Sequence, residues 1–148
     1  MKIVADNAIP FLKGVLEPYA RVEYLPGKTI ATADVRDADA LIVRTRTRCD
    51  AALLEGSSVK LIATAIIGFD HIDTAWCAAH GIEVTTAAGC NARGVLQYVA
   101  AALVRLSRVQ AWEPADKTLG IVGVGHVGSL VEAYARTWGF RVVACDPP

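Results

Sequence analysis

Long apolar runs are missing from this chain of 148 residues. The longest uninterrupted one, from Tyr98 to Val104, has seven residues, whereas a membrane-spanning helix needs about 20. Neither sign of charge is in excess, because 15 Lys and Arg residues balance 15 Asp and Glu residues. Surfaces that bind nucleic acid or anionic lipid carry an excess of positive charge. We therefore expect neither a nucleic acid nor a membrane as a partner.

The cysteines lack the spacings of a C-x-x-C pair or a zinc site. The chain has four cysteines, Cys49, Cys77, Cys90 and Cys145. No two of them form a C-x-x-C pair, and no cysteine–histidine cluster has zinc-ligand spacing. Asp6, Asn7 and Pro10 interrupt the N-terminus before an apolar signal segment develops. We expect no metal site, reduced thiols and a cytoplasmic location.

What the sequence does have is a regular alternation of short apolar runs and helical patterns. Hydrophobic residues make up 53% of the chain and charged residues 20%, a balance typical of a globular protein. The alternation predicts an α/β fold in which helices cover both faces of a parallel sheet. Strands are expected at residues 3–5, 21–24, 40–43, 61–65, 83–86, 119–122 and 141–145. Helices are expected at residues 9–19, 32–37, 51–54, 74–80, 92–108 and 127–138.

The longest predicted helix separates two lobes. It follows Asn91, a suitable N-cap, and its apolar stripe consists of Val95, Val99, Leu103 and Leu106. We place one lobe at residues 1–95, the helix and joint at 92–117, and a second lobe at 118–148. The second lobe supplies only strand, helix and strand, whereas a dinucleotide-binding fold uses about six strands. We therefore expect the chain to be part of a longer protein; the alternative is that another partner completes the sheet.

One glycine motif carries chemistry. Gly123, Gly125 and Gly128 form G-x-G-x-x-G between a predicted strand and a predicted helix, which is the context of a dinucleotide-binding loop. In such a loop the first glycine permits a tight turn, the second lets a pyrophosphate approach the backbone, and the third allows close helix–strand packing. The amides of His126 and Val127, at the helix start, are expected to face the phosphates.

Asp146 lies 18 residues after Gly128, where the ribose of a bound nucleotide is expected. A carboxylate accepts hydrogen bonds from a ribose diol and repels a 2′-phosphate, by about 4 kcal/mol for unit charges 4 Å apart at an effective dielectric near 20. The nearest arginine, Arg141, lies too far back along the strand to offset that repulsion. The motif therefore predicts NAD rather than NADP. The alternative is that the glycines only form a turn and Asp146 only ends a strand.

With this loop located, the chain resembles the D-isomer-specific 2-hydroxyacid dehydrogenase family along its whole length. Besides the glycine loop, four segments carry the resemblance: ADALIVR at 38–44, GFDHID at 68–73, GCNA at 89–92 and CDPP at 145–148. The resemblance implies a flavodoxin-like parallel-sheet substrate lobe, followed by the start of a Rossmann NAD-binding lobe. The last two segments point to the branch of the family that acts on 4-phospho-D-erythronate.

The resemblance also implies an activity. It is the NAD-dependent oxidation of 4-phospho-D-erythronate to 2-oxo-3-hydroxy-4-phosphobutanoate, in pyridoxal 5′-phosphate (vitamin B6) biosynthesis, by a homodimer. The family's catalytic arginine, glutamate and histidine are expected beyond position 148, so this chain holds no catalytic residue and is expected to be inactive alone. Two alternatives stay open: another D-2-hydroxyacid dehydrogenase, such as the phosphoglycerate enzyme, and a non-catalytic dinucleotide-binding module.

Candidate substrate contacts lie in the first lobe. By resemblance, Thr45 matches a small hydroxyl residue that contacts substrate in the family. The backbone of residues 64–68, which ends at Gly68, matches the loop that cradles the substrate carboxylate. Ile66 stands in this loop where many members have threonine, so a hydroxyl contact is lost or supplied elsewhere.

Charged residues beside these positions have two interpretations each. Arg44, Arg46 and Arg48 alternate after a predicted strand, and Arg44 above all is a candidate to receive the substrate's phosphate, because guanidinium groups bind phosphate bidentately. The alternative is a solvated loop. His71 lies between two aspartates, and we expect it to be structural rather than catalytic.

Overall fold

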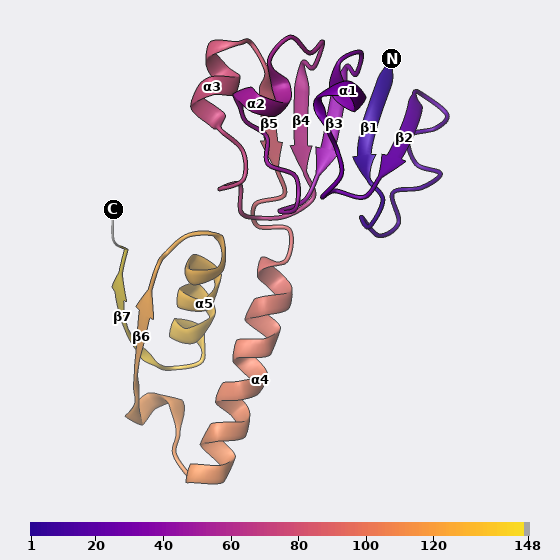
Figure 1. Cartoon of the computed structure of the whole chain (residues 1–148). Helices are drawn as coiled ribbons and strands as arrows, with labels where there is room; N and C mark the ends of the chain where they lie inside the picture. Colours follow the sequence, from indigo (N-terminus) through magenta and orange to yellow (C-terminus); the bar gives the residue numbers. More distant parts are fainter. Residues whose placement is uncertain (147–148) are drawn as a thin grey trace. The chain divides into compact units, whose positions relative to one another are not determined.

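The computed structural model describes residues 1–146. Pro147 and Pro148, which end the CDPP segment, lie outside the described residues. The chain divides into two compact units, Met1–Ala88 and Gly89–Pro148, and Figure 1 shows the elements of each. The division of roles among residues 1–95, 92–117 and 118–148 stays a prediction.

The first unit is built on a five-stranded parallel sheet. Its strands are β1 (Lys2–Asp6), β2 (Arg21–Leu25), β3 (Ala40–Val43), β4 (Leu61–Thr64) and β5 (Glu83–Thr86). They lie in the order β2-β1-β3-β4-β5, and every neighbouring pair is parallel. This is the flavodoxin-like order. The predicted α/β class is therefore confirmed, with all five strands where the apolar runs predict them.

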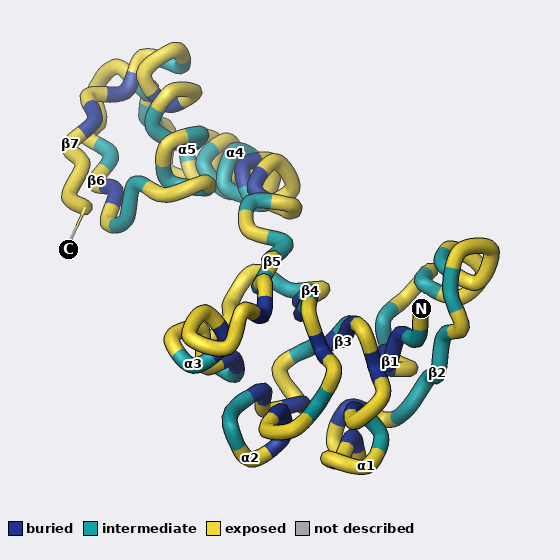
Figure 2. Tube along the Cα trace, turned by 90° about the horizontal axis from the view of Figure 1, so that it is seen from above, coloured by how far each residue is buried: buried dark blue, intermediate teal, exposed yellow. Residues whose placement is uncertain are grey.

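Three short helices cover this sheet: α1 (Thr32–Val35), α2 (Ala51–Leu54) and α3 (Thr74–Ala79). In the view of Figure 2 all three lie on the same side of the strands. Between them and the sheet lies a core that includes Val4, Val35, Leu41, Leu54 and Ile62, all fully or almost fully buried. The expectation that helices cover both faces is wrong for this unit.

The segment that joins β1 to β2 explains the difference. Parallel crossovers are right-handed, so this connection, which runs the opposite way along the sheet from the others, serves the opposite face. The helix expected at residues 9–19 is absent there, and the described segment consists of turns. Pro10 and Pro18 remove backbone donors, and Gly14 takes a φ of +88°. Phe11 is 95% exposed, so the segment buries too little apolar surface to stabilise a helix.

The second unit contains α4 (Ala92–Gln110), the 3₁₀ turn η1 (Pro114–Asp116), β6 (Thr118–Val122), α5 (His126–Thr137) and β7 (Arg141–Cys145). β6 and β7 are parallel neighbours, and α5 connects them. This strand–helix–strand unit is the opening of a Rossmann fold, as predicted. Its core consists of Leu96, Ile121, Val131, Ala135, Phe140 and Val142. Among residues 1–146 no helix is both long and apolar enough to cross a bilayer.

The long helix α4 lies beside α5 (Figure 1). Leu96 is buried, and Val99 and Leu103 pack against the same core. Leu106, expected on the same apolar stripe, is 46% exposed instead, because the half-buried position after Leu103 is Ser107. Asn91 is the N-cap residue, although its side chain makes no capping hydrogen bond.

Candidate functional site

The glycine loop connects β6 to α5 in the second unit. Gly123 has a φ of +88°, a left-handed conformation that favours glycine, and its amide donates to the Cys145 carbonyl at 2.8 Å. A Cβ atom on Gly128 would collide with the Gly123 carbonyl oxygen. Chain neighbours apart, no atom of residues 1–146 lies within 4 Å of the Cβ position of Gly125. The loop therefore has a tight turn, a close helix–strand contact and a stretch of open backbone.

Asp146 follows β7 directly and contacts this loop. Its Oδ1 accepts a hydrogen bond from the amide of Val124 at 2.8 Å. The exposed carboxylate thus stands beside the turn, at the carboxyl ends of both strands, where a Rossmann fold holds the ribose of its nucleotide. Its Oδ2 accepts no hydrogen bond from the described residues, so this oxygen is free to accept one from a ligand. The residues present fit a dinucleotide.

The first turn of α5 supplies the anion-binding end of the loop. The helix begins at His126, with Gly125 as its N-cap, and the first amides of a helix have no partner within it. These amides and the positive end of the helix dipole favour a phosphate. The ring of His126 packs against Gly89, where a Cβ would lie 2.6 Å from its Cδ2, and Val127 packs on the core. Both side chains pack within the unit, which leaves the two backbone amides at the helix start; their contact with phosphates stays a prediction.

The candidate substrate residues gather at one edge of the first unit. Arg44 and Thr45 follow β3, and residues 64–68 run from the last residue of β4, its neighbour, into the next loop. Because the strands are parallel, their carboxyl ends share this edge. Thr45 and Gly68 are exposed, and Ile66 is half-buried. The structure thus brings all four candidates to one edge of the sheet.

Sequence reasoning missed a residue at this edge, Asp6. Its carboxylate, at the end of β1, is 1% exposed and accepts hydrogen bonds from Arg44 Nε at 3.0 Å and Arg44 Nη2 at 3.3 Å. The amide of Ala8 donates to it at 2.9 Å. Burial, the largest influence, raises the pKa of Asp6, but Arg44 and backbone amides together outweigh it, so the pKa lies below its ordinary value. The signal was available: one acid and one arginine each follow a short apolar run.

A groove of about 450 Å³ lies between the loops that follow β2 and β3. Its charged lining residues are Lys28, Arg46, Arg48 and Asp50. Arg48 Nε pairs with Asp50 Oδ2 at 2.7 Å, while Lys28 and Arg46 make no ion pair with the described residues. Arg44 turns instead toward Asp6. The groove therefore carries a net positive charge, separate from the Arg44 pair.

The backbone of His71 takes part in the hydrogen bonding that holds the fold together. Its carbonyl accepts from the Cys49 amide at 2.8 Å, and burial lowers the pKa of its imidazole, although the charge of Asp70 opposes the change. Its Nε2 and the Thr64 hydroxyl are buried without a hydrogen-bond partner among the described residues. Within residues 1–146 no three His, Cys, Asp or Glu side chains cluster as metal ligands do.

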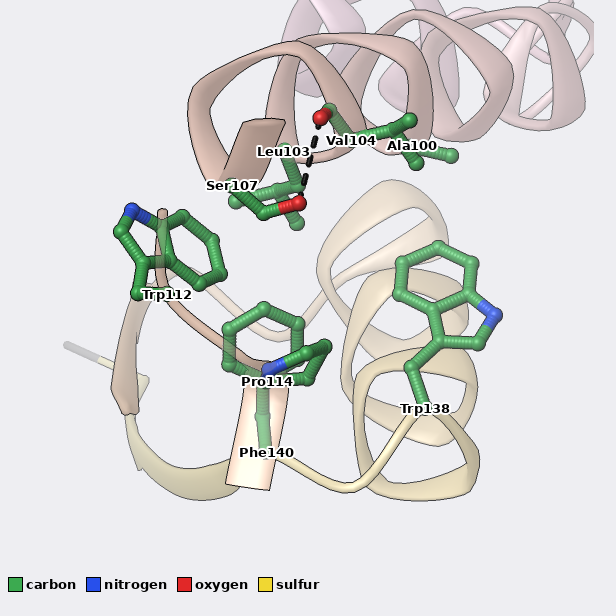
Figure 3. A pocket seen from close by; sticks show the side chains of 8 residues that line it. All are labelled: Ala100, Leu103, Val104, Ser107, Trp112, Pro114, Trp138 and Phe140. Carbon is green, nitrogen blue, oxygen red and sulfur yellow. Dashed lines mark hydrogen bonds between the residues drawn. The ribbon is translucent and has the colours of Figure 1, made fainter. Parts of the chain in front are cut away.

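The second unit also contains an apolar cavity of about 250 Å³ (Figure 3). Trp112, Pro114, Trp138 and Phe140 face it from below α4, and Leu103 lies on the α4 side. No titratable side chain lines it, and its one hydroxyl, on Ser107, donates to the Val104 carbonyl at 3.2 Å. This cavity has packing residues and no group that performs acid–base chemistry.

Comparison with known proteins identifies the family. Residues 2–137 match the family model described as D-isomer specific 2-hydroxyacid dehydrogenase, catalytic domain. The chain belongs to this family. The glycine loop, the edge that holds Arg44 and the segment between them all lie within the matched residues.

Curated relatives match over the whole chain. The erythronate-4-phosphate dehydrogenases of Bacteroides fragilis and Porphyromonas gingivalis are 52% and 45% identical to it. The matches cover 43% and 40% of those proteins, so this chain spans less than half the length of these relatives.

Solved structures share the fold. The NAD⁺-bound 3-phosphoglycerate dehydrogenase of Entamoeba histolytica is 29% identical, with a TM-score of 0.72 over 99% of this chain and 54% of that one. The D-lactate dehydrogenase of Aquifex aeolicus, complexed with NAD and lactic acid, is 24% identical, with a TM-score of 0.75 over 97% of this chain and 50% of that one. Both likenesses agree with the parallel-sheet architecture described above.

Proposed function

We propose that the protein containing this chain oxidises 4-phospho-D-erythronate to 2-oxo-3-hydroxy-4-phosphobutanoate with NAD, in pyridoxal 5′-phosphate biosynthesis. The observation that carries the proposal is the glycine loop closed by Asp146, in a chain 52% identical to an erythronate-4-phosphate dehydrogenase. A carboxylate at this position disfavours a 2′-phosphate, which supports NAD over NADP.

In this proposal the residues of this chain bind the cofactor and orient the substrate. Bound NAD supplies a hydride acceptor for the C2 carbon of the substrate. The amides of His126 and Val127 and the open backbone at Gly125 hold the pyrophosphate, and Asp146 holds the ribose. Gly123 and Gly128 shape the loop that makes this possible.

The first lobe, residues 1–95, orients the substrate. Thr45 and the backbone from Ile66 to Gly68 contact it, and Arg44 receives its phosphate. Residues 118–148 begin the NAD-binding lobe, and residues 92–117 join the two. The 148 residues alone cover 43% of the relative's length, and we propose that they bind NAD but complete no turnover.

Calorimetric titration with NAD and NADP tests the cofactor half. The chain is expected to bind NAD more tightly than NADP. Asp146→Ala should weaken NAD binding about tenfold or more, because it removes a hydrogen bond to a charged group. Asp116→Ala, an exposed position in η1, is the matched control and should leave binding unchanged. An equal effect of the two substitutions would contradict the proposed role of Asp146.

An assay of NADH formation tests the substrate half. The protein at the length of its relatives is given NAD with 4-phospho-D-erythronate or with 3-phosphoglycerate, and the first acid should give the higher kcat/KM. A preference for 3-phosphoglycerate would contradict the proposed substrate. This outcome is tested because the structurally similar Entamoeba histolytica enzyme is a 3-phosphoglycerate dehydrogenase. NAD binding without oxidation of either acid would favour a binding module.

Two finer points belong to the same proposal. We infer a homodimer at full length, which light scattering after gel filtration would measure. We also infer a cytoplasmic location, supported by four free cysteines of which Cys90 and Cys145 are exposed, since such thiols stay reduced in that compartment.

A further inference from the structure

The Asp6–Arg44 pair stands at the point where the strand order of the first sheet reverses. From β1 the chain moves to β2 on one side, and it later returns to form β3 on the other side, as Figure 1 shows. In open parallel sheets, ligands bind in the crevice outside the carboxyl ends of the two strands at such a point. Asp6 is the last residue of β1, and Arg44 is the first residue after β3.

The geometry of the pair leaves one side of the guanidinium available. Arg44 uses Nε and one N–H of Nη2 on the two oxygens of Asp6. The other N–H of Nη2 and the adjacent N–H of Nη1 form a second fork, which makes no hydrogen bond with another side chain of residues 1–146. The Arg44 side chain is 33% exposed, whereas that of Asp6 is 1% exposed. A fork of this shape binds two oxygens of a phosphate.

The carboxylate of Asp6 is itself held in place by neighbouring backbone. The amide of Ala8 fixes Oδ1, and Gly27 packs so closely that a Cβ there would lie 2.5 Å from Oδ2. The Thr47 hydroxyl, bonded to the Gly27 carbonyl at 2.8 Å, keeps that backbone in place. A buried carboxylate carries a large desolvation cost, and here Arg44 and the Ala8 amide both donate hydrogen bonds to it.

We propose that Asp6 is a positioning residue: it fixes the orientation of Arg44 so that the second guanidinium fork receives the phosphate of the substrate. The inference rests on the proposed function, which supplies a phosphorylated 2-hydroxy acid. Asp6 itself does not touch the substrate. It lowers the conformational freedom of the arginine, so less of the binding free energy is lost in ordering that side chain.

The test follows the guanidinium by NMR in the whole 148-residue chain. The Arg44 Nε–H signal is titrated with 4-phospho-D-erythronate, inorganic phosphate and D-erythronate. It should shift saturably with the first two and not with the third, which separates the phosphate from the carboxylate. Asp6→Asn should weaken phosphate binding about tenfold or more, whereas Asp37→Asn, an exposed partner of Lys2, should not change it.

A double-mutant cycle separates positioning from general stability. Arg44→Lys keeps the positive charge but lacks the fork, so it should lose most of the phosphate affinity. Adding Asp6→Asn to it should cost little more, because the residue that Asp6 positions is already gone. Additive losses would show that Asp6 acts by another route. If Asp6→Asn does not fold, Gly27→Ala replaces it, since it displaces the carboxylate and keeps both charges.

Three results would overturn the inference. They are an Arg44 signal unmoved by every phosphate compound, an Asp6→Asn variant that binds phosphate as tightly as the unmodified chain, and additive losses in the cycle. The proposed function is judged separately by NADH formation, so it survives each of these results if the assay gives the expected preference.

Discussion

Gly128 leaves less room for a side chain than any other described glycine of the second unit. A Cβ there would meet the carbonyl oxygen of Gly123, which is backbone and has little freedom to move aside. Gly94 is the opposite case, because it lies within α4 with open space at its Cβ position. Glycine is therefore required by packing at position 128, whereas a larger side chain fits at position 94.

Gly128→Ala should lower the free energy of unfolding by about 1–3 kcal/mol, the usual cost of forcing atoms into a packed site. It should also weaken NAD binding, since the loop must shift to relieve the collision. Gly94→Ala should instead stabilise the chain, by about 0.5–1 kcal/mol, because alanine favours a helix interior. Urea unfolding measures both. A Gly128→Ala variant as stable as the unmodified chain would refute the packing role.

Asp6 makes a pH-dependent contribution to stability. Its folded pKa lies below the ordinary value of 3.8, so folding is favoured by the ionised carboxylate. This contribution is complete above the unfolded pKa and is lost as the pH falls through the folded pKa. Asp6→Asn should therefore destabilise the chain at neutral pH, and the difference should narrow below about pH 4. Urea midpoints measured across this range provide the check, and a constant difference would contradict it.

At the scale of elements, α4 depends on a narrow buried stripe. Leu96→Ala should cost about 2–5 kcal/mol, because it opens a cavity in the core of the second unit. Leu106→Ala removes the same atoms from a side chain that is 46% exposed, and its effect should stay within about 0.5 kcal/mol. Thermal unfolding followed by near-UV absorption of Trp112, which packs on that core, distinguishes the two. Equal losses of stability for the two substitutions would contradict the assignment of Leu96 to the buried face of α4.

Local patterns predicted the elements well and long-range partners poorly. The glycine loop was predictable because its close contact is local: Gly128 packs against Gly123, five residues before it. The helix expected at residues 9–19 failed because its apolar residues have no surface to pack on, a property of the sheet and not of the segment. The bond between Asp6 and Arg44 joins residues 38 apart, and only the strand order brings them together. The roles proposed for Thr45 and Ile66 come from resemblance to the family, because no local pattern in the sequence marks a substrate contact.

At the scale of the whole molecule, each unit has its own core cluster, and the two differ in how well strands are enclosed. β1 and β3 have neighbours on both sides and consist mainly of buried residues. β7 has one neighbour and a single buried residue, Val142. Backbone amides exchange their hydrogens more slowly where the strand is buried and paired on both sides, because local unfolding there costs more free energy.

Hydrogen exchange should therefore rank the strands. Amides of β1 and β3 are expected to exchange slowest, and those of β7 fastest among the strands of the chain. Mass spectrometry of peptides from a timed exchange gives the order, with added NAD expected to slow exchange in the β6–α5 loop. Faster exchange in β1 than in β7 would contradict the ranking.

The outer surface of the β6–β7 pair has a practical consequence for handling this protein. Val122 is 81% exposed and Val143 58%, on a two-stranded sheet whose outer strand edges are unpaired within the described residues. Such an edge is a template for another chain. We therefore expect aggregation of concentrated protein to begin at this strand pair, and Val143→Lys should reduce it without changing the nucleotide loop.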